Sequence, residues 1–131
     1  MAQYMYSASA EYDDAGCITV TDINLSFFNY FAPDVKVRAG KTYCSKSRTY
    51  RALIASLNGW GDAFMRRVQF QTPTDQRLSE QYDKETSEQV GAADLTWSYA
   101  SVLTAALARA EARGEKNYAK RLANMGFEPN E

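Results

Sequence analysis

The chain has 131 residues, of which 45% are hydrophobic and 24% charged, a composition typical of one globular domain with a core. Fifteen Lys and Arg residues nearly balance sixteen Asp and Glu residues, so the charge favours neither nucleic acid nor an anionic membrane surface as a partner. The sequence contains no histidine, which excludes Ser-His-Asp and Cys-His nucleophile systems and the HExxH zinc site.

Cysteine content and hydropathy restrict the chain further. Cys17 and Cys44 are too few for a zinc site, which needs four ligands, so we expect no metal and no cofactor; whether the two cysteines pair stays open. The longest uncharged stretch, 95–108, is shorter than the roughly 20 apolar residues of a membrane span. The start of the chain lacks the pattern of a signal peptide. We therefore expect either a cytosolic protein or a chain whose true beginning is missing.

In the first third of the chain, apolar spacing predicts two helices. The first covers about 2–12 and ends before Gly16. Residues 18–21 alternate like a strand but have no obvious partner, so we expect an extended connector there. Asp22 can cap a second helix, which Pro33 ends. Residues 33–47 are polar or basic without a period, which predicts a loop.

The rest of the chain is also predicted to be mainly helical. A longer helix covers about 50–71, where Gly59 and Gly61 indicate a kink or close packing against a neighbour. Residues 72–91 form a polar loop with five carboxylates. Residues 92–113 give the strongest helix pattern, and because the first half is apolar nearly all round, we expect it to be buried between layers. A short helix follows Gly114.

Three strings in and after the polar loop carry a resemblance to a known family. They are LSEQYDK at 78–84, EQ at 88–89 and ADLTWSYA at 93–100. Together they closely resemble the carboxy-terminal catalytic segment of fungal glucoamylases, the inverting glycoside hydrolases of family 15, and the spacing from Glu80 to Trp97 fits without an insertion or deletion. An upstream stretch is also similar, with Gly16, residues 18–22, Leu25, Phe27 and Phe28 in matching order.

The resemblance implies an all-α fold, the (α/α)6 toroid, in which inner and outer helices alternate. Residues 1–131 would be the carboxy-terminal portion of such a catalytic domain and would supply the last helices of the barrel. The helix predicted at 92–113 suits an inner helix. Two departures stand out: Ser87 lies where the family usually has Gly, and the loop 33–48 is more basic than expected.

The resemblance assigns the chemistry to Glu80, as the general base that deprotonates the attacking water. Inverting hydrolysis also needs a second carboxyl group, roughly 6.5–9.5 Å from the first, to protonate the leaving oxygen. Nothing in the sequence resembles the family segment that carries this acid. We therefore expect the isolated chain to be catalytically incomplete.

Three neighbours of the base are candidate substrate-binding residues. Trp97 resembles the aromatic wall of the innermost sugar subsite, although a Trp at the start of a buried helix is also a common core residue. Gln81 and Tyr82 flank the base and could orient it or the water, or equally satisfy the backbone of the loop. Asp94 is predicted to be the amino-terminal cap of the following helix or a partner of its dipole, and we expect structural roles for the other loop acids: Asp83, Glu85 and Glu88.

These features predict a glucoamylase fragment that acts on starch, maltooligosaccharides or related α-glucans and releases β-glucose from their non-reducing ends. The parent enzyme would be extracellular, and the triplet Asn24-Leu25-Ser26 is a possible N-glycosylation site that also arises by chance. Two alternatives stay open. One is a non-catalytic helical glucan-binding or interaction domain derived from such an enzyme, and the other is a relative that cuts another α-glucosidic linkage.

Overall fold

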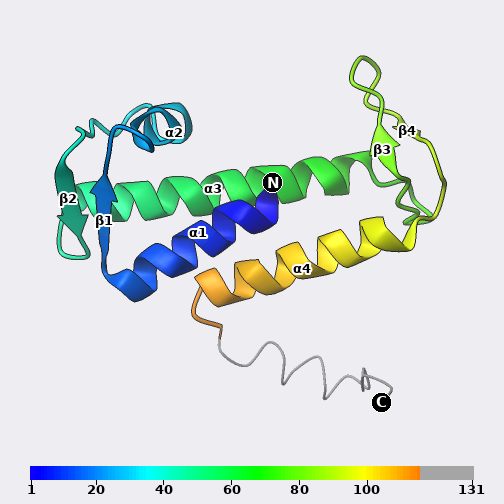
Figure 1. The fold of residues 1–131 in the computed structure, drawn as a ribbon. Coiled ribbons are helices and arrows are strands. Elements are labelled where there is room, and N and C mark those ends of the chain that lie inside the picture. The colour runs from blue at the N-terminus through cyan, green and yellow to red at the C-terminus, as the bar shows by residue number, and fades with distance from the viewer. Residues whose placement is uncertain (116–131) are drawn as a thin grey trace.

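The computed structural model describes residues 1–115 and shows an elongated, mainly helical molecule with two small two-stranded sheets (Figure 1). The all-α prediction is confirmed. The helix expected after Gly114 lies outside the described residues. In chain order the elements are α1 (Ala2–Ala15), β1 (Cys17–Val20), α2 (Leu25–Phe31), β2 (Lys41–Cys44), α3 (Arg48–Gln71), β3 (Gln81–Tyr82), β4 (Gln89–Val90) and α4 (Thr96–Ala112).

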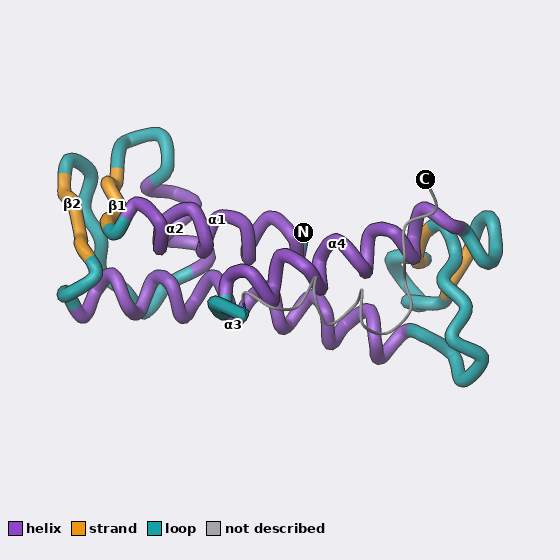
Figure 2. The backbone as a smooth tube through the Cα atoms, turned by 90° about the horizontal axis from the view of Figure 1, so that it is seen from below, coloured by secondary structure: helices purple, strands orange, loops and turns teal. Residues whose placement is uncertain are grey.

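The long helix α3 is the axis of the molecule. Helices α1 and α4 pack along it and against each other, and both run antiparallel to it (Figures 1 and 2). Helix α2 lies on the other side of α3 in Figure 1. The two sheets lie at opposite ends of α3, with β1 and β2 at its start and β3 and β4 beyond its end. The molecule therefore has two distinct ends joined by helices.

Helix α3 begins with a side-chain cap and buries one stripe. The Ser47 hydroxyl accepts a hydrogen bond from the Tyr50 amide at 3.0 Å, which satisfies one free amide of the first turn. Close packing is confirmed at Gly61, because a Cβ atom there would lie 2.5 Å from Cε1 of Tyr6. A Cβ atom added at Gly59 would have no neighbouring atom within 4 Å. Gly61 thus lets the Tyr6 ring lie directly on the α3 backbone.

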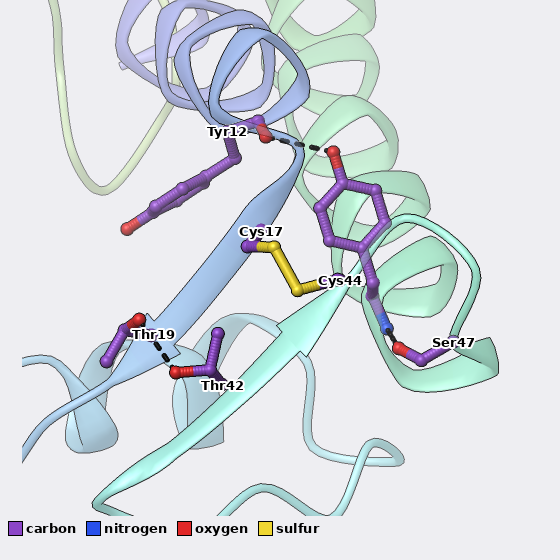
Figure 3. Close-up of a disulfide and its surroundings, with 7 residues drawn as sticks. Tyr12, Cys17, Thr19, Thr42, Cys44 and Ser47 are labelled. Carbon is purple, nitrogen blue, oxygen red and sulfur yellow. Dashed lines mark hydrogen bonds between the residues drawn. A yellow bond between two sulfur atoms is a disulfide. The ribbon is translucent and has the colours of Figure 1, made fainter.

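The expectation of an unpaired connector at 18–21 is wrong, as is that of an uninterrupted loop at 33–47. Strand β1 pairs antiparallel with β2, with Cys17 opposite Cys44, and the two cysteines form a disulfide (Figure 3). Thr19 and Thr42 share a hydrogen bond on the same ribbon at 3.0 Å. Four residues of alternation do not identify a partner more than twenty residues away, which is why the sequence pattern missed the pairing.

The main apolar core lies at this disulfide end. One cluster of buried side chains joins β1, α2 and α3, and comprises Ile18, Val20, Phe28, Ala32, Tyr50 and Leu53. The Tyr50 hydroxyl donates to the Tyr12 carbonyl at 2.9 Å, which ties the end of α1 to α3 (Figure 3). Burial of these side chains fixes β1 and α2 on the first turns of α3.

The second helix begins later than predicted, at Leu25, and its cap position is Asn24 and not Asp22. The side chain of Asn24 explains the delay, because it accepts a hydrogen bond from the Thr21 amide at 2.7 Å and donates to the Thr19 carbonyl at 3.1 Å. These bonds form a turn before the helix. Ile23 therefore lies outside the helix and is 92% exposed. The side-chain amide of Asn24, the acceptor of the glycosylation triplet, is thus held by a hydrogen bond within the fold.

Helix α4 is confirmed, but it begins at Thr96 and not at residue 92. Ala105 and Ala108 of its second half are buried in a cluster with Ala2 and Tyr6. The expectation that the first half of this helix is buried is wrong, since Leu103, in the first half of α4, is 58% exposed. The reason is that α1 covers only the second half of α4, and no described element covers the outer side of the first half.

A polar cluster joins α1, α3 and α4 near the middle of the molecule. The Asp62 carboxylate accepts hydrogen bonds from the Tyr6 hydroxyl at 2.6 Å and from Arg109 and Arg113 at 2.8 Å each. Partial burial raises the pKa of Asp62, but these hydrogen bonds and the two positive charges outweigh that effect and lower it. Burial, together with the hydrogen bond to Asp62, raises the pKa of Tyr6 to about 12. The cluster therefore favours an ionised Asp62 beside a neutral Tyr6.

Candidate active-site loop

The loop 72–95 connects α3 with α4 and contains the small hairpin of β3 and β4 (Figure 1). Asp83 closes its tip by accepting hydrogen bonds from the amides of Thr86 at 2.8 Å and Glu85 at 2.9 Å. These backbone bonds lower the pKa of Asp83. Asp83 therefore has the structural role expected from the sequence, and the hairpin holds the chain on either side of it.

The backbone around Glu80 is fixed against the start of α4. The Glu80 amide donates to the Ala92 carbonyl at 2.9 Å. The Ser98 hydroxyl donates to the Ser79 carbonyl at 2.8 Å. Ser79 precedes Glu80 and Ser98 follows Trp97 in the chain, so this second bond brings together the two segments that carry the predicted base and the predicted sugar contact.

The carboxylate of Glu80 is exposed and lightly restrained. Its Oε2 atom accepts one hydrogen bond, from the Ala92 amide at 3.3 Å, and within residues 1–115 it forms no ion pair. Gly91 adopts a positive φ of 83°, and a Cβ atom there would lie 2.9 Å from Oε2 of Glu80. Gly91 therefore leaves room for the carboxylate. One oxygen is held by the backbone while the other is available to water or substrate.

Trp97 lies in the first turn of α4 and is 79% exposed. It is outside both buried clusters of the described residues, so it does not serve this chain as a core residue. Its indole lines a surface depression together with Thr96, Ala100, Ser101 and Thr104. An exposed indole is available to stack on an apolar face of a ligand. The role of Trp97 as a sugar contact stays a prediction.

Gln81 and Tyr82 form β3 and pair with Val90 and Gln89. An ideal Cβ atom on Gly91 would lie 3.5 Å from Nε2 of Gln81, so this amide lies close to the turn that also faces Glu80. Partial burial raises the pKa of Tyr82. Within the described residues neither side chain makes a hydrogen bond to Glu80 or to the loop backbone. Both stay candidates for contacts with water or substrate.

The prediction that Asp94 caps α4 is wrong. Leu95 occupies the cap position, and Asp94 has a positive φ of 59°. Its carboxylate instead accepts a hydrogen bond from the Tyr99 hydroxyl, which raises the pKa of Tyr99. The same hydroxyl accepts from the Leu78 amide at 3.3 Å. Tyr99 thus links α4 to the loop segment that precedes Glu80.

Ser98, Gly91 and Gln89 hold the loop and were not singled out from the sequence. Ser98 binds the Ser79 carbonyl, Gly91 leaves space for Glu80, and the Gln89 carboxamide binds the Ser79 amide at 2.6 Å. The glycine carried a usable signal, because a glycine next to a short strand often marks a turn of positive φ. The two polar residues lie in the strings that carry the family resemblance, but their roles could not be read from it, since their partners depend on how the loop folds.

The described part of the chain offers neither a metal cluster nor a membrane helix. Among residues 1–115, no three His, Cys, Asp or Glu side chains gather closely enough to hold a metal ion. In the same range, no helix is both long and apolar enough to span a membrane.

Comparison with known proteins places the chain in one family. The family model described as glycosyl hydrolases family 15 matches residues 1–107. A glucoamylase from Blastobotrys adeninivorans is 45% identical over 125 residues, which are 95% of this chain and 20% of that protein. A glucoamylase from Neurospora crassa is 41% identical over 109 residues, which are 83% of this chain and 17% of that protein.

A solved structure agrees with these relatives. The family 15 glucoamylase from Hypocrea jecorina superposes with a TM-score of 0.76 at 38% identity, over 83% of this chain and 18% of that one. The chain thus spans about a fifth of the length of the relatives that it matches. It belongs to the glycosyl hydrolases of family 15.

Proposed function

We propose that residues 1–131 are the carboxy-terminal portion of a glucoamylase catalytic domain, and that Glu80 is its general base. The observation that carries the proposal is the geometry of Glu80, an exposed carboxylate with one oxygen on the Ala92 amide and the other free of protein partners within residues 1–115. A general base needs an accessible carboxylate on a fixed backbone, because it must reach the proton of one positioned water.

In this mechanism the water attacks the anomeric carbon while Glu80 accepts its proton, and the configuration at that carbon inverts. A second carboxyl group, about 6.5–9.5 Å away, protonates the leaving oxygen. The matched relatives are about five times longer than this chain, and we place the acid in the remainder of the enzyme. The exposed indole of Trp97 stacks on the glucose ring beside the scissile bond.

The substrates proposed are starch and maltooligosaccharides, cut from their non-reducing ends with release of β-glucose. Other helices of an (α/α)6 toroid would cover the exposed half of α4, including Leu103. The disulfide between Cys17 and Cys44 supports an extracellular enzyme, because such bonds persist in oxidising compartments.

The test replaces the carboxylate in the full-length enzyme that carries this segment. Glu80→Gln keeps the size of the side chain and removes the base, so we expect turnover of maltooligosaccharides to fall by about 100-fold or more. Maltose binding, measured by calorimetry, should stay within about threefold of the parent value. Glu88→Gln is the matched control, since Glu88 is an exposed carboxylate of the same loop.

Two results would contradict the proposal. If Glu80→Gln keeps near-normal turnover, Glu80 is not the base. If the full-length protein binds maltose but does not hydrolyse α-glucans, the non-catalytic binding domain is the better description. NMR spectra of freshly released glucose decide the stereochemistry, because inversion gives the β anomer first.

A further inference from the structure

The side chain of Gln89 binds three backbone groups from different parts of the loop. Its Oε1 atom accepts a hydrogen bond from the Ser79 amide at 2.6 Å. Its Nε2 group donates to the Gln71 carbonyl at 3.0 Å and to the Arg77 carbonyl at 3.1 Å. Gln71 is the last residue of α3, and Ser79 immediately precedes Glu80. One carboxamide therefore fastens the chain before Glu80 to the end of the long helix.

The bond to Ser79 completes a set of restraints around Glu80. The Ser79 carbonyl is held by the Ser98 hydroxyl, and the Glu80 amide is held by the Ala92 carbonyl. Gln89 is the member of this set that connects the loop to α3, whereas the others connect it to α4 or to the hairpin. Without Gln89, the link between Glu80 and the α3 side of the site would be lost.

We propose that Gln89 is a positioning residue for catalysis, which holds the Glu80 carboxylate at the correct distance from the attacking water. The chemistry of the three partners explains why a glutamine is needed, because only a carboxamide offers an acceptor for the Ser79 amide and donors for two carbonyls. A glutamate supplies acceptors alone. This inference rests on the proposed role of Glu80 as the base.

The position of Gln89 predicts a specific kinetic effect. A displacement of about 1 Å in a catalytic group can cost about 100-fold in rate. Glu80 acts on the water, whereas the sugar is bound by other groups, so loss of positioning lowers kcat and leaves KM nearly unchanged. A residue that only supported the fold would instead lower the amount of active enzyme.

The experiment compares variants of the full-length enzyme that carries this segment. Gln89→Met keeps the length of the side chain and removes all three bonds, and Gln89→Glu removes only the donors. Gln76→Met is the control, because Gln76 lies in the same loop and its side chain makes no hydrogen bond within residues 1–115. With maltooligosaccharides as substrate, kcat and KM are measured on the folded fraction, and hydrogen exchange is followed at the Ser79 amide.

We expect both Gln89 variants to lower kcat by about 10- to 100-fold with KM within about threefold, and to speed exchange at Ser79. The control should match the parent enzyme. A kcat within about twofold of the parent in a folded Gln89 variant would overturn the inference, as would a loss of kcat fully explained by less folded enzyme. If Glu80→Gln is inactive while Gln89→Met is fully active, only the positioning role of Gln89 is contradicted. If Glu80→Gln is active, the proposed function itself is contradicted.

Discussion

The two ends of α3 are held by different kinds of interaction. At its start, β1, β2 and α2 enclose buried apolar side chains such as Ile18 and Phe28, and the Cys17–Cys44 disulfide closes the ribbon. Beyond its end, the loop 72–95 buries a single large apolar side chain, Leu78. That loop depends on bonds from polar side chains to the backbone.

The proposed role of Glu80 would account for this difference. A carboxylate that acts on water has to stay accessible, and burying it in an apolar core would disfavour its charged form. Side chains such as Gln89 and Ser98 can fix a backbone without covering the carboxylate beside it. Apolar burial and a covalent bond therefore stabilise the end away from the site, and directional hydrogen bonds shape the end that contains it.

Removing the disulfide should produce the largest change in stability. Its cysteines are 27 residues apart, and a cross-link that closes such a loop contributes roughly 3.5 kcal/mol by restricting the unfolded chain. The double variant Cys17→Ser with Cys44→Ser should lower the free energy of unfolding by about that amount in urea titrations.

Hydrogen exchange shows whether the two ends respond separately. In the serine double variant, amides of β1 and β2 should exchange faster, while the Glu80 amide keeps its protection relative to global unfolding. The parent protein treated with a mild reductant is the matched control, since it opens the same bond without a substitution. An equal loss of protection at both ends would show that the ends are one cooperative unit.

The Asp62 cluster joins the two ends, and its loss should have an intermediate effect. Asp62→Asn removes the ionised partner of Arg109 and Arg113 in a partly exposed site, so we expect a loss of about 1–2 kcal/mol. Because the folded state lowers the pKa of Asp62, its contribution is present above the unfolded pKa and disappears as the pH falls through the folded value.

Urea titrations at several pH values below about 5 test this sign. The parent protein should lose stability more steeply than Asp62→Asn as the medium becomes acidic, and the two curves should converge. Tyr6→Phe is the control, because it removes one hydrogen bond to Asp62 and leaves both ion pairs in place. A constant difference between the curves at all pH values would contradict the assignment.

Helices were predictable from the sequence because their apolar spacing is local. The pairing of β1 with β2 was not, since it depends on a partner distant in the chain. The start of α4 was misplaced for a related reason: the Leu95 amide donates to the Leu78 carbonyl at 2.8 Å, which holds this segment against the loop and delays the helix. Propensity favoured a helix there, and a tertiary contact prevented it.

For the site, the sequence could indicate Glu80 and Trp97 through their resemblance to a family motif. The residues that hold them were harder to predict. Gln89 is an ordinary glutamine until the fold places the Gln71 and Arg77 carbonyls beside its amide. Hydrogen-bond partners in an irregular loop have no sequence period, so no local pattern indicates them.

The smallest effect should come from Ser87, which lies in the loop 72–95. Its φ is 63°, in the left-handed region that costs a residue with a Cβ atom about 1–2 kcal/mol. Ser87→Gly removes that cost but adds freedom to the unfolded chain, so we expect a gain of about 0.5–1 kcal/mol. Thermal unfolding measures both variants, and Ser87→Ala, which keeps the Cβ atom, should show no gain in the free energy of unfolding. A stabilised alanine variant would show that the serine hydroxyl, and not backbone strain, disfavours this turn. A gain confined to glycine would show that backbone strain at Ser87 destabilises the loop end.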